Sequence, residues 1–374
     1  MSGNGLFGLG LIGCGSFGTF CLEAFGRIPE IRIAAVADVS REVADRCAGK
    51  FDVPAYYDPR EMVRQDEVNI VHIATPPAGH HELAISAIRA NKHVLCEKPL
   101  AMNLRQADEM LAAAAGAGVI LPVNFVLRYN RVTEAAKAII DSGAVGRVLA
   151  ARLTNCAFDS LMGPEHWFWK RDVSGGIFIE HGVHFFDLYN HWLGPGRVIN
   201  AHAEDREGTG QEDRVTCTIL HDSGAVASHY HGFDQIKMMD RADHRLICEM
   251  GDIRVEGWIP LALSVDAAVD AEGAARLAEC CPGGEVEVIE EYGSEQGRIM
   301  GRGKLRTVTR RIRLRYRPES DKQAVYAANV RELLSDQIAY IRDRSHGRRV
   351  TESNGRDALA LAQAADKLAQ TPKN

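Results

Sequence analysis

Short apolar runs alternate with amphipathic stretches along the first third of the chain. The runs at residues 8–12, 31–37, 68–74, 93–96 and 119–125 have the length and composition of buried strands. Between them, apolar spacing or a capping residue predicts helices over residues 16–27, 40–51, 61–64, 80–91 and 103–117. Strands that alternate with helices are typical of a doubly wound parallel sheet with helices on both faces. We therefore expect an α/β domain over residues 1–125.

The pattern changes after residue 125. A helix is expected over residues 130–142, and strands are expected at 147–155, 215–220, 225–231, 245–249, 253–258, 285–292 and 307–317. Many strands without helices between them favour an open, mostly antiparallel sheet. Helices rich in Ala and Leu follow at residues 324–344 and 355–370. We expect an α+β domain over residues 126–374, whose last helices are free to pack back on the first domain.

The composition is that of an ordinary globular protein. Of the 374 residues, 46% are hydrophobic and 25% are charged, which is enough for two domains and a large core. The net charge of −6 argues against nucleic acid or an anionic membrane as a partner. The nine cysteines include no CxxC pair, which favours reduced thiols and a cytoplasmic location. The amino-terminal stretch has no basic leader, and no apolar run approaches membrane-spanning length.

One predicted strand near the end of the chain has a basic face. Arginines at positions 311, 313, 315 and 317 alternate with apolar residues. In a chain of net negative charge, we interpret this face as a solvated surface or a subunit contact rather than a nucleic-acid site.

A glycine-rich turn follows the first apolar run. Gly13, Gly15 and Gly18 have the spacing GxGxxG between a predicted strand and a predicted helix. In that context the first glycine permits a tight turn, the second lets a pyrophosphate approach the backbone, and the third lets helix and strand pack closely. The free N–H groups at the helix start, around Ser16 and Phe17, point at the anion. The motif predicts a dinucleotide-binding site.

An acidic residue ends the next apolar run. Asp38 follows Gly18 by twenty positions, where a carboxylate can hold both ribose hydroxyls of NAD. Its charge repels a 2′-phosphate, although Arg41 could offset that repulsion. We expect NAD as the cofactor, with NADP as the alternative.

Polar residues and prolines stand at the ends of the later strands. Thr75 and Pro76 follow the run at 68–74, and Glu97, Lys98 and Pro99 follow the run at 93–96. Ligands of open α/β sheets bind beyond the carboxyl ends of the strands. We therefore expect Thr75 and Pro76 to contact the cofactor through backbone and ring.

A second stretch with candidate chemistry follows the double glycine at 175–176. Glu180, His184 and Asp187 have the spacing i, i+4 and i+7, so they share one face if the segment is a helix. The rest of that face is apolar, and a carboxylate in apolar surroundings needs a partner. We expect these three side chains to belong to a site.

These motifs resemble those of the glucose–fructose oxidoreductase and inositol dehydrogenase family (Gfo/Idh/MocA). The resemblance covers the first half of the chain, and the C-terminal part is similar only in general pattern. It implies an N-terminal Rossmann domain and a C-terminal domain with an open sheet, through which subunits of the family often pair. We therefore expect a homodimer or homotetramer. The matching motifs are Gly13-x-Gly15-x-x-Gly18 with Asp38, Thr75-Pro76 followed by His80-His81-Glu82, the most specific Glu97-Lys98-Pro99, and Gly175-Gly176 leading to His184 and Asp187.

The resemblance also implies a catalytic pair, with Lys98 and His184 beside the nicotinamide and the substrate alcohol between them. Oxidising a secondary alcohol removes a hydride and a hydroxyl proton, so a base must reach that oxygen. Lys98 could take the proton when partly desolvated beside a cationic nicotinamide, and histidine titrates near neutral pH. Glu180 stands where the family usually has Asp. We include it as a catalytic candidate that orients Lys98 or His184, or that binds a substrate hydroxyl.

Two further places could bind substrate. Trp169 could stack on a sugar ring and Lys170 could bind hydroxyls or carboxylates, while the alternative for residues 166–171 is a hydrophobic loop anchor. Arg128 matches a common family position, and it is either a substrate contact or structural.

We expect an NAD(P)-dependent oxidoreductase that acts on a secondary alcohol of a sugar, cyclitol or polyol. The alternatives are a glycosidase or lyase that uses tightly bound NAD for transient oxidation, and a non-catalytic NAD-binding regulator, against which Lys98 argues. No metal site is expected. The expected cofactor-binding residues are Gly13, Gly15, Ser16, Phe17, Gly18, Asp38, Thr75, Pro76, His80, Glu97 and Lys98. The expected substrate-binding residues are Lys98, Arg128, Trp169, Lys170, Glu180, His184 and Asp187.

Overall fold

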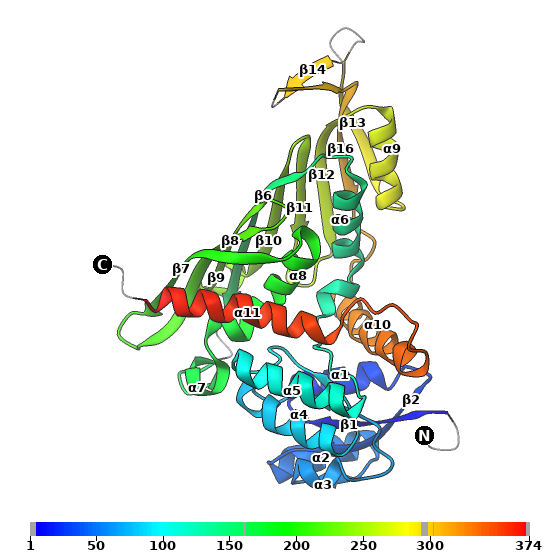
Figure 1. The fold of residues 1–374 in the computed structure, drawn as a ribbon, viewed down its shortest axis with the longest axis vertical. Coiled ribbons are helices and arrows are strands. Elements are labelled where there is room, and N and C mark those ends of the chain that lie inside the picture. The colour runs from blue at the N-terminus through cyan, green and yellow to red at the C-terminus, as the bar shows by residue number, and fades with distance from the viewer. Residues whose placement is uncertain (1–4, 160–161, 293–297, 302, 372–374) are drawn as a thin grey trace. The chain divides into compact units, whose positions relative to one another are not determined.

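The computed structural model describes residues 5–159, 162–292, 298–301 and 303–371. The chain forms two compact units, each drawn from distant parts of the sequence (Figure 1). Unit 1 comprises Met1–Tyr129, Met162–Asp187 and Tyr326–Lys367, and unit 2 comprises Asn130–Leu161, Leu188–Val325 and Leu368–Asn374. The sequence predicted two continuous domains that meet at residue 125, and that boundary stays a prediction.

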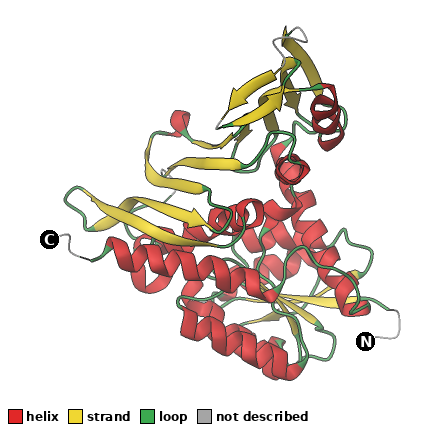
Figure 2. Cartoon of the chain, turned by 45° about the horizontal axis from the view of Figure 1, so that its top comes forward, coloured by secondary structure: helices red, strands yellow, loops and turns green. Residues whose placement is uncertain are grey.

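Unit 1 contains a five-stranded parallel sheet in the order β3-β2-β1-β4-β5. Its short strands lie among helices (Figure 2), and every residue of β1 and β4 is buried, as in a sheet covered on both faces. The expected parallel α/β sheet is confirmed. The chain order reverses beside β1, between β2 and β4, so ligand-binding loops are expected at the carboxyl ends of these strands. The elements are β1 (Phe7–Ile12), α1 (Ser16–Phe25), β2 (Ile31–Ala37), α2 (Arg41–Phe51), β3 (Ala55–Tyr56), α3 (Pro59–Met62), β4 (Ile70–Ile73), α4 (His80–Arg89), β5 (His93–Cys96), α5 (Leu104–Ala117), α7 (Arg171–Ser174), α10 (Lys322–Arg342) and α11 (Glu352–Ala369), the first residues of α10 belonging to unit 2.

The strand expected over residues 119–125 is wrong as a regular strand. The segment runs beside β5 through hydrogen bonds from Val94 N to Ile120 O and from Cys96 N to Pro122 O. Only one isolated bridge, between Cys96 and Val123, meets the geometry of a ladder. Proline has no N–H to donate, so Pro122 interrupts the pairing.

Helix α11 packs directly on this segment within unit 1. A Cβ on Gly355 would lie 2.4 Å from a methyl carbon of Val123, so only glycine permits this approach. The Gln363 side chain accepts from Leu104 N at 3.0 Å, and the Glu352 carboxylate accepts from Leu121 N at 3.2 Å. The C-terminal helix therefore belongs to the packing of the parallel sheet.

Unit 2 contains a nine-stranded sheet in the order β13-β16-β12-β11-β10-β6-β9-β8-β7. All its neighbours are antiparallel except β6 and β9, so the expected mostly antiparallel sheet is confirmed. Helix α6 begins after Asn130, whose side chain accepts from Val132 N and Thr133 N, and ends before Gly143, which agrees with the helix expected over residues 130–142. The elements are α6 (Arg131–Ser142), β6 (Val148–Phe158), α8 (Val183–Leu193, shared between the units), β7 (Gly196–Arg206), β8 (Gln211–His221), β9 (Val226–Gln235), β10 (Arg241–Cys248), β11 (Gly251–Glu256), β12 (Ala262–Val269), α9 (Ala271–Cys280), β13 (Glu285–Glu291), β14 (Arg298–Gly301), β15 (Lys304–Thr307) and β16 (Arg310–Tyr316).

Strands β7 and β12 and helix α9 have no counterpart among the elements expected from the sequence. Strand β7 is an edge strand with few buried residues, so it has little apolar alternation. Strand β12 does alternate between buried and partly exposed positions, but several of its residues are alanine, serine or aspartate. Small side chains carry a weak periodic signal, and only pairing with β11 and β16 reveals the strand.

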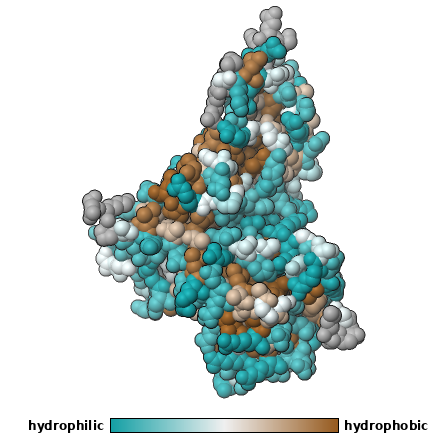
Figure 3. All heavy atoms as spheres, in the orientation of Figure 1, coloured by the Kyte–Doolittle hydropathy of each residue, from teal (hydrophilic) through white to brown (hydrophobic). Residues whose placement is uncertain are grey.

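The open face of the large sheet is polar in places and apolar in others. On β16, Arg311 and Arg315 are exposed while Ile312 and Leu314 are buried, so the predicted basic and apolar faces are confirmed. Arg311 pairs with Asp266 at 2.8 Å, and Arg315 pairs with Glu287 at 3.0 Å. Neighbouring strands therefore neutralise the arginines. Figure 3 shows hydrophobic residues among the strands of this sheet.

Several histidines lie buried in unit 2 around Tyr189. The ring of His229 lies 4.5 Å from that of Tyr189, and His244 Nδ1 lies 3.3 Å from the Tyr189 hydroxyl. Burial lowers the pKa of His244 to about 3 and holds the pKa of His229 well below its ordinary value. Both rings are therefore neutral in the folded protein at neutral pH.

We expect the folded state to lose stability as the pH falls below about 6.5. Below that pH the histidines of the unfolded chain bind protons, whereas the buried rings of the folded protein stay neutral. The free energy of unfolding therefore falls by about 1.4 kcal/mol per histidine and pH unit. Thermal unfolding measured from pH 8 to pH 4.5 tests this. The variant His244→Phe should show a shallower acid slope than the wild type, and equal slopes would contradict the assignment to His244.

Candidate active site

The glycine-rich turn has the shape that a dinucleotide requires. Gly13 has φ = 94°, and a Cβ there would lie 2.6 Å from Ala74 O. A Cβ on Gly18 would lie 2.1 Å from Gly13 O. A Cβ on Gly15 would meet no protein atom within 4 Å, so the fold itself does not require glycine there. Space beside Gly15 is what a bound pyrophosphate needs.

Helix α1 starts at this turn without a side-chain cap. Gly15 is its N-cap residue and provides no side-chain acceptor, so the first N–H groups of α1 remain available to an anion. Ser16 is exposed, as a cofactor contact requires. Phe17 packs on Phe20 and Tyr326, with ring centroids 6.1 and 5.9 Å apart.

We expect alanine substitutions to separate the roles of the glycines. Gly15→Ala should leave the melting temperature nearly unchanged, since Gly15 has φ = −63° and open space, but should weaken NAD binding at least about tenfold. Gly18→Ala should lower both stability and affinity, because its methyl group meets backbone. Calorimetric titration with NAD and thermal unfolding measure the two effects. Unchanged NAD affinity in Gly15→Ala would contradict the pyrophosphate assignment.

Asp38 sits at the end of β2 beside the turn. Its carboxylate accepts from Cys14 N and from Ser40 N, each at 2.9 Å. A carboxylate has about four acceptor positions, so capacity remains for ribose hydroxyls. Arg41 lies over the ring of Tyr57, 4.0 Å from its centroid, and is not paired with Asp38 by any contact among the described residues. This arrangement favours NAD over NADP.

Thr75 and Pro76 follow β4 as expected, but His80 lies behind them. Pro76 is exposed, and Thr75 Oγ1 has no hydrogen-bond partner among the described residues. His80 is fully buried, with Nδ1 2.7 Å from Pro99 O and Nε2 2.9 Å from Thr75 O. Burial lowers the pKa of His80, which favours the neutral ring. A neutral ring carries one N–H, so it donates to only one of the two carbonyls at a time. We interpret His80 as a brace between the two loops rather than a direct cofactor contact.

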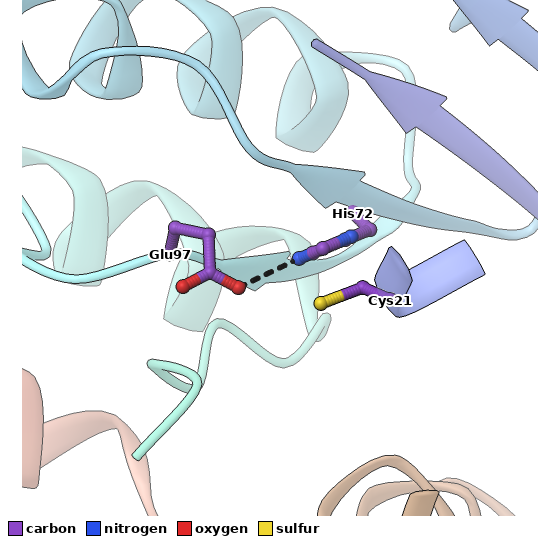
Figure 4. A group of neighbouring side chains, drawn as sticks. All are labelled: Cys21, His72 and Glu97. Carbon is purple, nitrogen blue, oxygen red and sulfur yellow. Dashed lines mark hydrogen bonds and ion pairs between the residues drawn. The ribbon is translucent and has the colours of Figure 1, made fainter. Parts of the chain in front are cut away.

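Glu97 points into the core, where it joins two strand ends. Its Oε1 accepts from Asn124 Nδ2 at 2.7 Å and lies 2.9 Å from His72 Nε2 (Figure 4). Cys21 completes a buried group of three metal-ligating residue types, the one such group among the residues described. The His72–Glu97 distance is that of a hydrogen bond, and zinc sites usually have four ligands. We interpret the group as a buried hydrogen-bond network that orients the residue after Glu97.

That residue, Lys98, is held by Glu180. Lys98 Nζ donates to the Glu180 main-chain carbonyl at 3.0 Å and forms an ion pair with its carboxylate. The contact spans 82 positions of sequence, yet both residues lie in unit 1. Residues Phe178–Gly182 form a π-helical turn that leads into α8, and such turns are frequent at functional sites. The two predicted catalytic residues Lys98 and Glu180 are therefore brought together.

His184 lies at the start of α8 and is buried. Its ring centroid lies 6.3 Å from that of His181, at 75°. Burial, and then the charge of Lys98, lower the pKa of His181 to about 3, so His181 is a neutral neighbour of the lysine. No role was expected for His181 from the sequence. Its position directly after Glu180 was the signal that could have identified it.

Asp187 and Arg128 form a buried ion pair. Arg128 Nε donates to Asp187 Oδ2 at 2.7 Å, and Nη2 donates to Oδ1 at 2.8 Å. Burial raises the pKa of Asp187, and Arg128 opposes that shift. The guanidinium of Arg128 and the carboxylate of Asp187 bind each other through two hydrogen bonds. We therefore interpret the pair as a structural link between residues 126–129 and α8 rather than as two substrate contacts.

The loop at 166–171 favours the anchor interpretation. Trp169 is buried, and its indole N–H donates to Met162 O at 3.2 Å. Lys170 remains half exposed and pairs with Glu165 at 3.2 Å. The structure does not bring Lys170 into a described contact with Lys98 or Glu180, and its role in substrate binding stays a prediction.

Comparisons with known proteins agree with this fold. The model of an oxidoreductase family with an NAD-binding Rossmann fold (GFO_IDH_MocA) matches residues 7–125, and the GFO/IDH/MocA C-terminal domain model matches residues 133–252. The chain is 33% identical to myo-inositol 2-dehydrogenase of Thermotoga maritima over 187 residues, which cover 50% of this chain and 54% of that protein. It is 36% identical to 1,5-anhydro-D-fructose reductase of Ensifer adhaerens over 180 residues, covering 46% and 53%. The matches thus span about half the length of these curated relatives.

The likeness to solved structures extends over nearly the whole chain. A levoglucosan dehydrogenase in complex with NADH has a TM-score of 0.77, covering 97% of this chain and 96% of that chain at 21% identity. Identity this low shows the fold alone. Among the described residues, no helix combines the length and apolar character needed to cross a membrane. The two family models together match more than half of the sequence, and this chain belongs to the Gfo/Idh/MocA family, with an NAD-binding Rossmann fold at its amino-terminal end.

Proposed function

We propose that the protein is an NAD-dependent dehydrogenase that oxidises a secondary alcohol of a sugar, cyclitol or polyol, or catalyses the reverse reaction. The observation that carries the proposal is the anchored Lys98. Its ammonium group stands at the end of β5 in an NAD-binding fold, held by the carboxylate and carbonyl of Glu180. The substrate class is supported by the names of the relatives, which include an inositol dehydrogenase and an anhydrofructose reductase.

Bound NAD would supply the hydride acceptor, and the residues of the turn fit it. The open space at Gly15 and the uncapped start of α1 suit a pyrophosphate, and Asp38 suits the ribose hydroxyls. Lys98 and His184 then hold and move the proton of the substrate hydroxyl. Glu180 fixes the direction of Lys98, and the Glu97–Asn124 hydrogen bond fixes the segment that carries it.

The test is a substrate panel with free cofactor. Inositols, aldoses, anhydrosugars and glycosides are incubated with NAD or NADP, and NAD(P)H absorbance is followed. We expect NADH to accumulate with at least one polyol. Cleavage of a glycoside without net NADH would instead indicate the alternative enzyme with tightly bound NAD. Tight NAD binding without conversion of any compound would support the regulator.

We expect Glu180→Gln to lower kcat by about tenfold to a hundredfold, because a released Lys98 loses its geometry. The KM for NAD should stay the same, since no contact among the described residues joins Glu180 to the glycine-rich turn. Glu180→Asp should restore part of kcat by keeping the charge. The exposed Glu109, which pairs with His81, offers Glu109→Gln as a matched control. An unchanged kcat in Glu180→Gln would show that the ion pair has no part in turnover.

The cytoplasmic location and the homodimer or homotetramer stay predictions of the sequence. Size-exclusion chromatography with light scattering decides the subunit number.

A further inference from the structure

Two cysteines meet at the glycine-rich turn of unit 1. Cys14 lies between Gly13 and Gly15 of that turn, and Cys47 lies on helix α2. A side-chain hydrogen bond joins the two thiols, which come from different elements of the sequence. The hydroxyl of Thr19 lies 3.9 Å from Cys47 Sγ and belongs to the same polar contact. The structure thus places a pair of reduced thiols inside the loop that NAD approaches.

Cys14 also connects the turn to the carboxylate expected to hold the ribose. Its main-chain N–H donates to Asp38 Oδ2 at 2.9 Å, and its carbonyl accepts from Thr19 Oγ1 at 3.2 Å. Its thiol donates to Ala37 O, at the end of β2, at 3.5 Å. The position of Cys14 therefore sets the path of the turn and the direction of the Asp38 carboxylate. A reaction at the Cys14 sulfur would be felt directly at the dinucleotide site.

The two thiols differ in acidity, as a nucleophile and its partner require. The hydrogen bond from the Cys14 thiol lowers the pKa of Cys47, although burial opposes the shift. The Thr19 hydroxyl and the Lys50 ammonium group lower the pKa of Cys47 further. The hydrogen bond to Cys47 raises the pKa of Cys14, and burial and the charge of Asp38 add to that rise. Because the thiolate is the reactive form of cysteine, Cys47 is the nucleophile and Cys14 keeps its proton.

Exposure separates this pair from the other two cysteines of unit 1. Cys14 and Cys47 are 5% and 4% exposed, whereas Cys21 and Cys96 are 0% exposed. Burial also raises the pKa of Cys21 and of Cys96 well above the ordinary value, so both stay protonated. Gly15 is exposed directly beside Cys14, which gives a small reagent an approach to the pair. A hydroperoxide is small and oxidises thiolates, so it should select this pair within unit 1.

We propose that Cys14 and Cys47 are a modification site at which a hydroperoxide forms a disulfide and thereby weakens NAD binding. The Cys47 thiolate attacks one peroxide oxygen, the O–O bond breaks, and the other oxygen takes a proton from solvent and leaves as water or an alcohol. The Cys14 sulfur then attacks the Cys47 sulfenic acid, so the S–S bond forms, the S–O bond breaks, and water leaves with the Cys14 proton. Each sulfur loses one electron, and one hydroperoxide accepts both.

The disulfide would change the contacts that hold the turn. It brings the two sulfurs to about 2.05 Å, which draws Cys14 and α2 together. The oxidised Cys14 sulfur has no proton to donate to Ala37 O, and the N–H that holds Asp38 moves with it. We expect the dissociation constant for NAD to rise about tenfold or more, which is the effect of losing one hydrogen bond to a charged group. The inference depends on NAD binding at the turn and not on the proposed substrate.

The test compares the reduced full chain with the same protein after treatment with hydrogen peroxide. Digestion without reductant, followed by mass spectrometry, should yield peptides joined at Cys14 and Cys47. Calorimetric titration should show the loss of NAD affinity after peroxide and its recovery after dithiothreitol. Cys47→Ala should bind NAD like the reduced wild type, both before and after treatment. Cys14→Ser keeps a donor to Cys47 but cannot form the disulfide, so dimedone should trap the sulfenic acid on Cys47.

A third cysteine provides the matched control. Cys280 on α9 is more exposed than either member of the pair, and Cys280→Ala should keep the full response to peroxide. The proposal is overturned if no joined peptide forms at peroxide doses that oxidise free glutathione, or if the joined protein binds NAD as tightly as the reduced one. An equal loss of affinity in Cys47→Ala would assign the effect to another residue. Circular dichroism confirms folding, and Cys47→Ser serves if Cys47→Ala does not fold.

Discussion

Lys98→Met is expected to reduce turnover by about a thousandfold or more while NAD still binds. Methionine keeps most of the volume of the side chain but has no proton to exchange, and general acid–base catalysis contributes about 10² to 10⁴. The buried Glu180 carboxylate also loses its cation. NAD affinity should change little, because no described contact joins Lys98 to the glycine-rich turn or to Asp38, whose carboxylate accepts from Cys14 N. Steady-state kinetics on the substrate found by the panel, with NAD titration, measures both quantities.

A matched lysine tests whether loss of a charge alone matters. Lys137 forms an i,i+4 pair with Asp141 on α6, so Lys137→Met removes a paired lysine in unit 2 and should keep wild-type kinetics. Retained turnover in Lys98→Met would show that Lys98 has no essential acid–base role. Loss of NAD binding in that variant would instead mean that Lys98 holds the cofactor, and the assignment to proton transfer would fail.

Arg128→Met is expected to lower the free energy of unfolding by about 3–5 kcal/mol. The substitution leaves Asp187 buried at 2% exposure without its bidentate partner, and an uncompensated buried charge is strongly destabilising. Denaturant unfolding of the wild type and the variant at neutral pH measures the loss. The double variant Arg128→Met, Asp187→Leu should recover much of the stability, because an apolar pair replaces both charges.

The pH dependence provides an independent check of this pair. Burial already raises the pKa of Asp187, and removal of Arg128 raises it further. The folded variant then binds a proton more readily than the unfolded chain, so its stability relative to the wild type should improve as the pH falls toward 5. A deficit that stays constant with pH would mean that lost packing, and not the charge of Asp187, causes the effect.

The local elements of unit 1 follow from sequence alone. Each depends on neighbours a few residues away: apolar runs for β1, β2, β4 and β5, the glycine spacing for the turn before α1, and Asn130 with Gly143 for the limits of α6 in unit 2. The wrong prediction of a strand over residues 119–125 also has a local cause. Pro122 lies within the apolar run and has no N–H to donate to a ladder.

Only the tertiary structure decided what the polar residues do. The sequence identified Glu97, Lys98, Arg128, Glu180 and Asp187 as candidates, but it placed Glu180 and Asp187 on one helix face and could not assign their partners. Folding pairs Lys98 with Glu180 across 82 positions and Arg128 with Asp187 across 59, and it turns Glu97 into the core. Burial makes such pairing obligatory, yet the choice of partner depends on which strand ends and helix turns meet in space. Periodicity therefore determined the elements and the candidate residues, whereas the contacts between distant segments divided those candidates into a site and its supports.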